Sequence, residues 1–179
     1  MRLRMMIASV ALMACATSAP AVEPTKLTVR VTGLFSADRE KDLREVFAEW
    51  PVVKIAGIDF DRAEVALTFD GDRLFPKAKP ADVLARLHER LGNLSNHTFG
   101  VKAVSTVPKD KLKRIEIPVA GLDCKACCLA AYEIVAKIDG VEQATASFKE
   151  GRITALIDAD KTDKSKLEAA LKQRGVTVK

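Results

Sequence analysis

Two short segments of the chain alternate apolar and polar residues, and each runs into a Gly-Leu pair. Residues 27–31 lead to Gly33 and Leu34, and residues 115–119 lead to Gly121 and Leu122, 88 positions later. A period of two is typical of a half-buried strand. Apolar residues at helical spacing follow each pair, at Leu43, Val46, Phe47 and Trp50 and again at Ala131, Ile134, Val135 and Ile138. The pattern therefore predicts a repeated strand-helix unit.

Each repeat continues with two more strands, a second helix and a short final strand. The strand pairs are expected at 53–60 and 65–69 and at 141–148 and 153–157, and the final strands at 99–104 and 176–178. The second helices are expected near 80–94 and around Leu167, Ala170 and Leu171, where Gly175 ends the helix. The order in both halves is βαββαβ. We therefore predict an α+β protein of two tandem units at 22–105 and 113–179, each an antiparallel sheet with helices on one face, joined by a linker at 106–112.

The first 21 residues have the features of an export signal. Arg2 and Arg4 precede an apolar run of about ten residues, where a membrane span needs about 20. We expect cleavage after Ala21 and a mature protein that is periplasmic or secreted. Residues 12–15 resemble a bacterial lipobox, although Met13 departs from its usual pattern, so lipidation of Cys15 is the alternative and is the one membrane attachment that we expect.

Charge and composition narrow the function classes. Loss of the signal lowers the formal charge from +5 to +3, and the lysines are interspersed with acidic residues. No basic stripe with aromatic residues is present, so nucleic acid is excluded as a partner. All four methionines lie within the signal, and the rest of the chain has two histidines. Any soft-metal chemistry must therefore use cysteines.

Cys124 and Cys127 stand between the predicted strand at 115–119 and the helix that follows it. The N-terminus of a helix favours an anion, through its unpaired N–H groups and its dipole, and the thiolate is the form of cysteine that binds metal. This pair is the best candidate for chemistry in the chain.

Residues 113–179 resemble the heavy-metal-associated (HMA) domain, the ferredoxin-like module of copper chaperones and metal-exporting ATPases. The resemblance is carried by the order Gly121, Leu122, Asp123, Cys124 and Cys127 and by the predicted βαββαβ order. It implies that the two thiolates bind one soft metal ion and exchange it with a metal-donor or metal-acceptor protein. The first half shares the fold pattern alone, because Ser36 and Arg39 stand where the second half has cysteines.

The metal stays open between Cu(I) and a divalent ion such as Zn(II). Two thiolates suit Cu(I), a soft ion that accepts few ligands. An Asp directly before the first Cys resembles a variant in zinc-, cadmium- or lead-exporting ATPases, where it is an oxygen ligand. Zn(II) prefers four ligands, so Asp123, Cys124 and Cys127 would be joined by water, a partner group or Cys128. A turn of about 100° per helical residue could instead direct Cys128 into the core.

Other interpretations remain. In an oxidising compartment the cysteine pair could form a structural or redox-active disulfide. Asp123 could simply cap the helix, and Lys125 is either solvated or compensates the charge of a metal-thiolate centre. A third class is an interaction domain without metal. The sequence contains no recognisable catalytic set, so no enzyme activity is predicted, and the first half is either a spacer or a docking surface for a partner.

Overall fold

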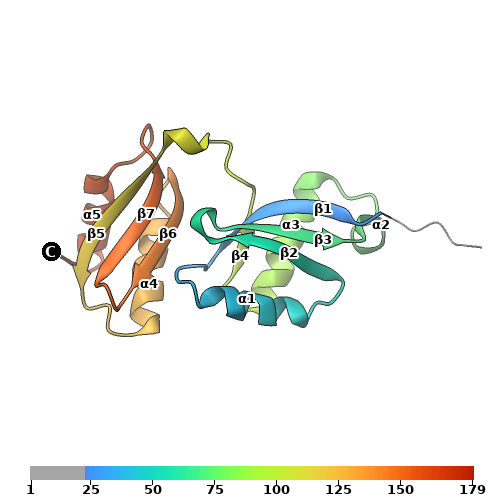
Figure 1. The fold of residues 1–179 in the computed structure, drawn as a ribbon, viewed down its shortest axis with the longest axis horizontal. Helices are drawn as coiled ribbons and strands as arrows, with labels where there is room; N and C mark the ends of the chain where they lie inside the picture. Colours follow the sequence, from blue (N-terminus) through green and yellow to red (C-terminus); the bar gives the residue numbers. More distant parts are fainter. Residues whose placement is uncertain (1–22) are drawn as a thin grey trace, which may run out of the picture.

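The computed structural model describes residues 23–179 as two units that lie side by side (Figure 1). The predicted signal, its cleavage site and Cys15 lie outside the described residues. Within residues 23–179, no helix has the length and hydrophobicity needed to cross a membrane.

The first unit is a four-stranded antiparallel sheet with the strand order β2-β3-β1-β4. Its elements are β1 (Thr25–Thr32), α1 (Arg39–Ala48), β2 (Val53–Asp59), the 3-10 turn η1 (Phe60–Arg62), β3 (Glu64–Phe69), α2 (Gly71–Leu74), α3 (Pro80–Leu94) and β4 (Gly100–Lys102). The one-turn helix α2 was not predicted. It forms because the Asp70 carboxylate accepts the Arg73 N–H, at 3.0 Å, and so caps the turn.

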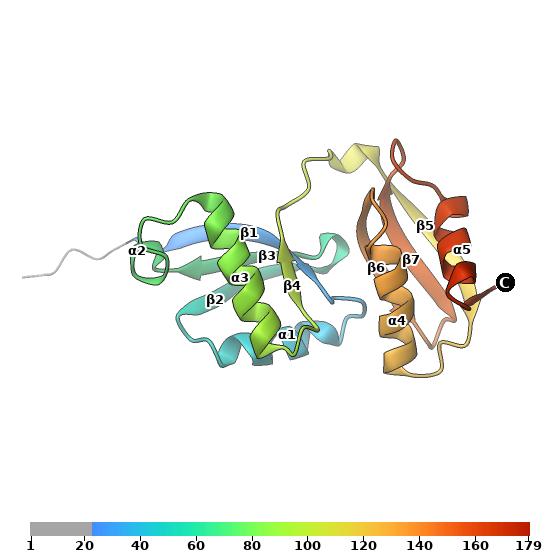
Figure 2. The same ribbon diagram turned by 180° about the vertical axis from the view of Figure 1, so that it is seen from behind.

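The second unit repeats this arrangement with the order β6-β7-β5-β8. Its elements are the 3-10 turn η2 (Lys109–Lys111), β5 (Leu112–Ala120), α4 (Lys125–Ala136), β6 (Val141–Ser147), β7 (Arg152–Asp158), α5 (Lys164–Gln173) and β8 (Thr177–Val178). Figure 2 shows α3 and α4 in front of the strands of their own sheets. The predicted class, two tandem ferredoxin-like βαββαβ units, is confirmed.

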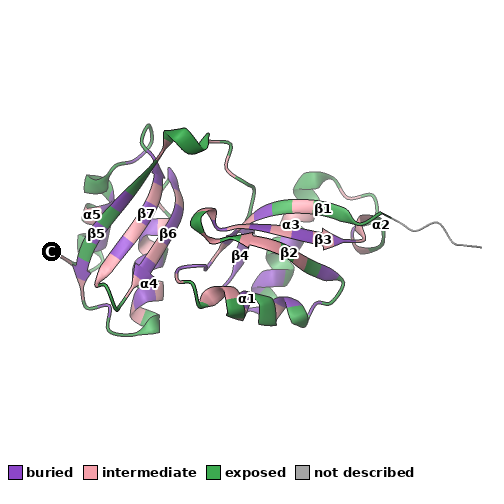
Figure 3. Ribbon diagram, viewed as in Figure 1, coloured by how far each residue is buried: buried purple, intermediate pink, exposed green. Residues whose placement is uncertain are grey.

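The predicted alternation accounts for the core of each unit. Val29 and Val31 of β1 are buried in the core of the first unit, and Ile115, Ile117 and Val119 of β5 are buried in the core of the second. Buried positions, in purple, recur along the strands of both sheets (Figure 3). One residue breaks this separation. Phe35 belongs to the first unit by sequence, but its side chain is buried in the core of the second. The two units therefore share a packed contact.

Candidate metal site and the contact between the units

The cysteine pair lies at the turn between β5 and α4, as the pattern predicted. Gly121 follows β5 with φ +81°, a left-handed conformation that reverses the chain at low cost for glycine. Cys124 has an extended backbone and caps α4, because its Sγ accepts the Cys127 N–H at 3.1 Å. The sulfur therefore receives a backbone donor that the helix leaves unpaired.

Cys124 and Cys127 form a disulfide in this structure, with their Cα atoms 5.1 Å apart. Cys124 is exposed and Cys127 is half-buried. The two sulfurs thus lie together at the surface, at the positive end of a helix, where reduction would leave two adjacent thiols. A disulfide has no thiolate to give a metal, so this geometry is that of the oxidised protein.

Asp123 is exposed on the loop before the pair. Its interpretation as the helix cap is wrong, because Cys124 occupies the cap position and provides the acceptor. The carboxylate is thus not engaged as the cap of α4.

Cys128 faces the protein interior. It carries a free thiol, is buried, and packs with Ala131 and Tyr132 in the core of the second unit. Burial raises the pKa of the Cys128 thiol, against a smaller opposite effect of a hydrogen bond from the Phe148 backbone.

The ligand set expected from the sequence is not assembled as one cluster. Among residues 23–179, no three His, Cys, Asp or Glu side chains are grouped closely enough to hold a metal ion. The structure therefore does not bring Asp123 and Cys128 together with the pair. For Cys128 the physical reason is the rotation of about 100° per helical residue, which turns its side chain from the surface into the core.

The equivalent loop of the first unit, residues 33–39, holds an arginine where the second unit has Cys127. The Arg39 guanidinium lies over the Phe99 ring, 4.3 Å from its centroid, and Nε donates to the Gly33 carbonyl at 3.3 Å. It also pairs with the Asp42 carboxylate. A permanent cation that bonds to the start of the loop at Gly33 and to Asp42 of α1 thus holds this loop in place.

That loop contacts the second unit at the free edge of β6. The Phe35 carbonyl accepts the Ala146 N–H at 2.9 Å, and the Phe35 ring lies 5.8 Å from the ring of Tyr132. The Gly33 N–H donates to the Tyr132 hydroxyl at 2.8 Å. Burial raises the pKa of Tyr132. The loop therefore covers a strand edge that would otherwise be open to pairing.

Polar contacts extend the interface on both sides of Phe35. Gln143 donates to the carbonyls of Leu34, at 3.1 Å, and Phe60, at 3.2 Å, and Arg30 pairs with Glu142. Lys125, which lies between the two cysteines in sequence, pairs with Asp38 at 2.8 Å, and this hydrogen bond holds the pKa of the Asp38 carboxyl below its usual value. The first unit is thus docked on the second and reaches the loop that carries the cysteine pair.

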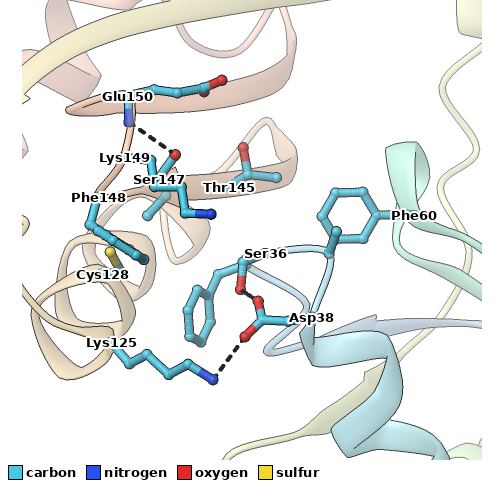
Figure 4. Close-up of a pocket in the computed structure, with 13 residues that line it drawn as sticks. Ser36, Asp38, Phe60, Lys125, Cys128, Thr145, Ser147, Phe148, Lys149 and Glu150 are labelled. Atoms are coloured by element: carbon cyan, nitrogen blue, oxygen red, sulfur yellow. Dashed lines mark hydrogen bonds and ion pairs between the residues drawn. The ribbon is translucent and has the colours of Figure 1, made fainter.

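A cleft of about 710 Å³ opens where the units meet (Figure 4). Lys125 and Cys128 of α4 lie on one side of it and Phe60 of the first unit on the other. Phe148, at the end of β6, also lines the cleft. Sequence reasoning missed this feature, although Phe60 and Phe148 occupy the same position in the 88-residue repeat.

The strand order and the glycine-led CxxC loop define the class of the second unit, which has a ferredoxin-like βαββαβ fold. No family model matches the sequence, and no curated protein matches it. Solved structures do resemble it. The "CopZ metallochaperone" has 25% identity and a TM-score of 0.37 and covers 37% of this chain and 100% of its own.

Two further structures are similar. Oxidized MerP from Ralstonia metallidurans CH34 has 24% identity and a TM-score of 0.36, over 38% of this chain and 94% of its own. The N-terminal soluble domains of Bacillus subtilis CopA have 18% identity and a TM-score of 0.36, over 89% of this chain and 95% of their own.

Proposed function

We propose that this chain is an exported carrier that captures one soft metal ion through Cys124 and Cys127 and passes it to a partner protein. One observation carries the proposal: the two sulfurs lie together, at the surface, at the N-terminus of α4. A pair of buried or divergent sulfurs could not exchange an ion with a partner. The resemblance to metallochaperones in sequence motif and fold supports the same function.

Cu(I) is the ion that the donor set fits best. Two thiolates satisfy Cu(I), whereas a four-coordinate Zn(II) needs two more ligands. Among the described residues no third donor is grouped with the pair. Exposed Asp123 is the candidate oxygen ligand for a divalent ion, and its use would require the loop to turn the carboxylate toward the sulfurs. A partner protein would supply any further ligand.

Metal capture requires prior reduction of the disulfide. Breaking the Cys124–Cys127 bond consumes two electrons and two protons, which a dithiol reductant supplies while it becomes a disulfide itself. Each thiol then releases its proton when it binds the metal. The oxidised pair agrees with an exported protein, since disulfides persist in oxidising compartments. The signal-like residues 1–21 support the same location, and Cys15 is the candidate lipid anchor.

The test is an anaerobic titration of the reduced protein with Cu(I) and with Zn(II), against chelators of known affinity. We expect one Cu(I) per chain, with affinity lowered at least about 100-fold in Cys124→Ser and in Cys127→Ser. Cys128→Ser is the matched control, because its thiol faces the core and should leave the affinity unchanged. Wild-type affinity in both CxxC variants would refute the proposal. Asp123→Ala should weaken Zn(II) and spare Cu(I) if the carboxylate is a ligand.

A second candidate function is thiol-disulfide exchange, which the observed disulfide favours. In that reaction a substrate thiolate attacks one sulfur of the pair, the other sulfur leaves, and a second substrate thiol then releases the substrate as a disulfide. The reduction potential separates the two functions. A strongly oxidising potential together with weak metal binding would favour exchange over metal transport.

A further inference from the structure

The cleft between the units adjoins the helix that carries the cysteine pair. Its volume of about 710 Å³ is within the range of protein sites that enclose a ligand. Lys125 and Cys128, which line it, belong to the first turn of α4. A molecule bound in the cleft would therefore lie next to the metal loop.

The cleft contains an aromatic side chain that the fold leaves exposed. Phe148 is 53% exposed, more than the other large exposed apolar residues of the described chain, Val52 and Val104. Phe35 and Phe60 line the same cleft. Exposed aromatic surface beside further aromatic rings is typical of an interaction site, because covering it removes apolar area from water.

The charges around the cleft leave one cation without a partner. Lys125 is neutralised by Asp38, and Glu150 by Arg152. Lys149, next to Phe148, forms no ion pair among residues 23–179. The surface thus complements an apolar side chain that has a carboxylate close by.

The cleft also lies next to the contact between the two units that was described above. The Phe35 carbonyl pairs with the β6 edge at Ala146, and the cleft-lining residues Thr145 to Phe148 carry that edge onward. We propose that the cleft is the docking site for a segment of the metal-exchanging partner protein that presents an aromatic residue flanked by acidic ones. This inference rests on the proposed function for the role of the partner, whereas the contact itself can be measured without metal.

Two matched peptides test the proposal by NMR titration of the 15N-labelled two-unit protein. N-acetyl-Glu-Phe-Glu-amide should shift the amide signals of residues 36–38 and 145–150, and N-acetyl-Lys-Phe-Lys-amide should bind at least about fivefold more weakly. Phe148→Ser should weaken the acidic peptide about fivefold or more, and Lys149→Glu should reverse the preference between the peptides. Both side chains are exposed, so neither change removes a core residue.

Val52→Ser is the matched control, since it removes an exposed apolar side chain of the first unit that does not line the cleft, and it should bind like the wild type. Shifts outside the cleft, equal binding of the two peptides, or insensitivity to Phe148→Ser would overturn the docking site. Each of these results is distinct from failure of the Cu(I) titration, which would overturn the metal function instead.

Discussion

The first loops of the two units have the same place in the fold and opposite chemistry. In the second unit the loop leads to exposed Cys124 and half-buried Cys127, which are linked by a disulfide. In the first unit the same positions are Ser36 and Arg39, and the guanidinium bonds across the turn. One loop stays accessible for exchange, whereas the other is held by a fixed cation and packed against its neighbour. The loop of the second unit is thus a candidate metal site, whereas the equivalent loop of the first unit forms a contact between the two units.

The largest expected effect comes from Phe35, which joins the first loop to the second core. Phe35→Ala should lower the free energy of unfolding by about 3–5 kcal/mol, because it leaves a cavity beside Tyr132. Phe148→Ala removes the same ring from an exposed position and should cost well under about 1 kcal/mol. Urea unfolding followed by circular dichroism measures both. Equal effects would show that the contact between the units does not stabilise the protein.

Tyr132→Phe should cost about 1–3 kcal/mol, since the buried Gly33 N–H loses its acceptor. It should also change the response to alkali. Because burial raises the pKa of Tyr132 above 10.0, the unfolded chain releases the phenolic proton first as the pH rises. The stabilisation from protonated Tyr132 is therefore fully present below about pH 10 and is lost as the pH rises through the pKa of Tyr132 in the folded protein.

The free energy of unfolding should be measured from pH 8 upward for the wild type and for Tyr132→Phe. Both proteins contain the same lysines, so the difference between them reports the titration of Tyr132 alone. A difference that stays constant through the alkaline range would contradict the assigned cause.

Arg39→Met keeps much of the side-chain volume and removes the cation of the first loop. We expect a loss of about 1–2 kcal/mol, from the contact with the Phe99 ring and the hydrogen bond to the Gly33 carbonyl. The single tryptophan, Trp50, lies in the first unit, so its fluorescence reports this loss during urea unfolding. Arg44→Met, on the same helix, is the control, and an equal loss there would mean that the position of the charge is irrelevant.

The smallest expected effect concerns the Asp38–Lys125 ion pair, whose side chains are 53% and 72% exposed. Asp38→Asn should lower the free energy of unfolding only slightly at low salt, and less at high salt, because an exposed ion pair contributes little and is screened by salt. Because the Lys125 hydrogen bond lowers the pKa of Asp38, its stabilisation is present above pH 3.8 and disappears as the pH falls further. Equal stabilities of wild type and variant at pH 7 in low salt would show that the pair only positions the loop.

Local patterns were sufficient to predict the βαββαβ strands and helices of both units and the place of the cysteine pair. Alternation at residues 115–119 and helical spacing from Ala131 to Ile138 bracket Cys124 and Cys127, so the turn between them follows from chain order alone. The burial of Cys128 could not be predicted in this way. A rotation of about 100° per helical residue gives the direction of its side chain relative to Cys127, but it does not say whether that direction faces the core or the solvent. The one-turn helix α2 was missed, since a single cap at Asp70 leaves no periodic signal.

The sequence by itself determined the two βαββαβ units, the loss of cysteines in the first, and a thiol pair at a helix N-terminus in the second. These depend on periodicity and spacing, which act over a few residues. Only the tertiary structure decided that Phe35 leaves its own unit to pack beside Tyr132, that the first loop closes the β6 edge, and that a cleft forms next to α4. Such contacts join residues about a hundred positions apart. They depend on the burial of apolar surface and on pairing at a strand edge, and neither leaves a periodic pattern in the local sequence.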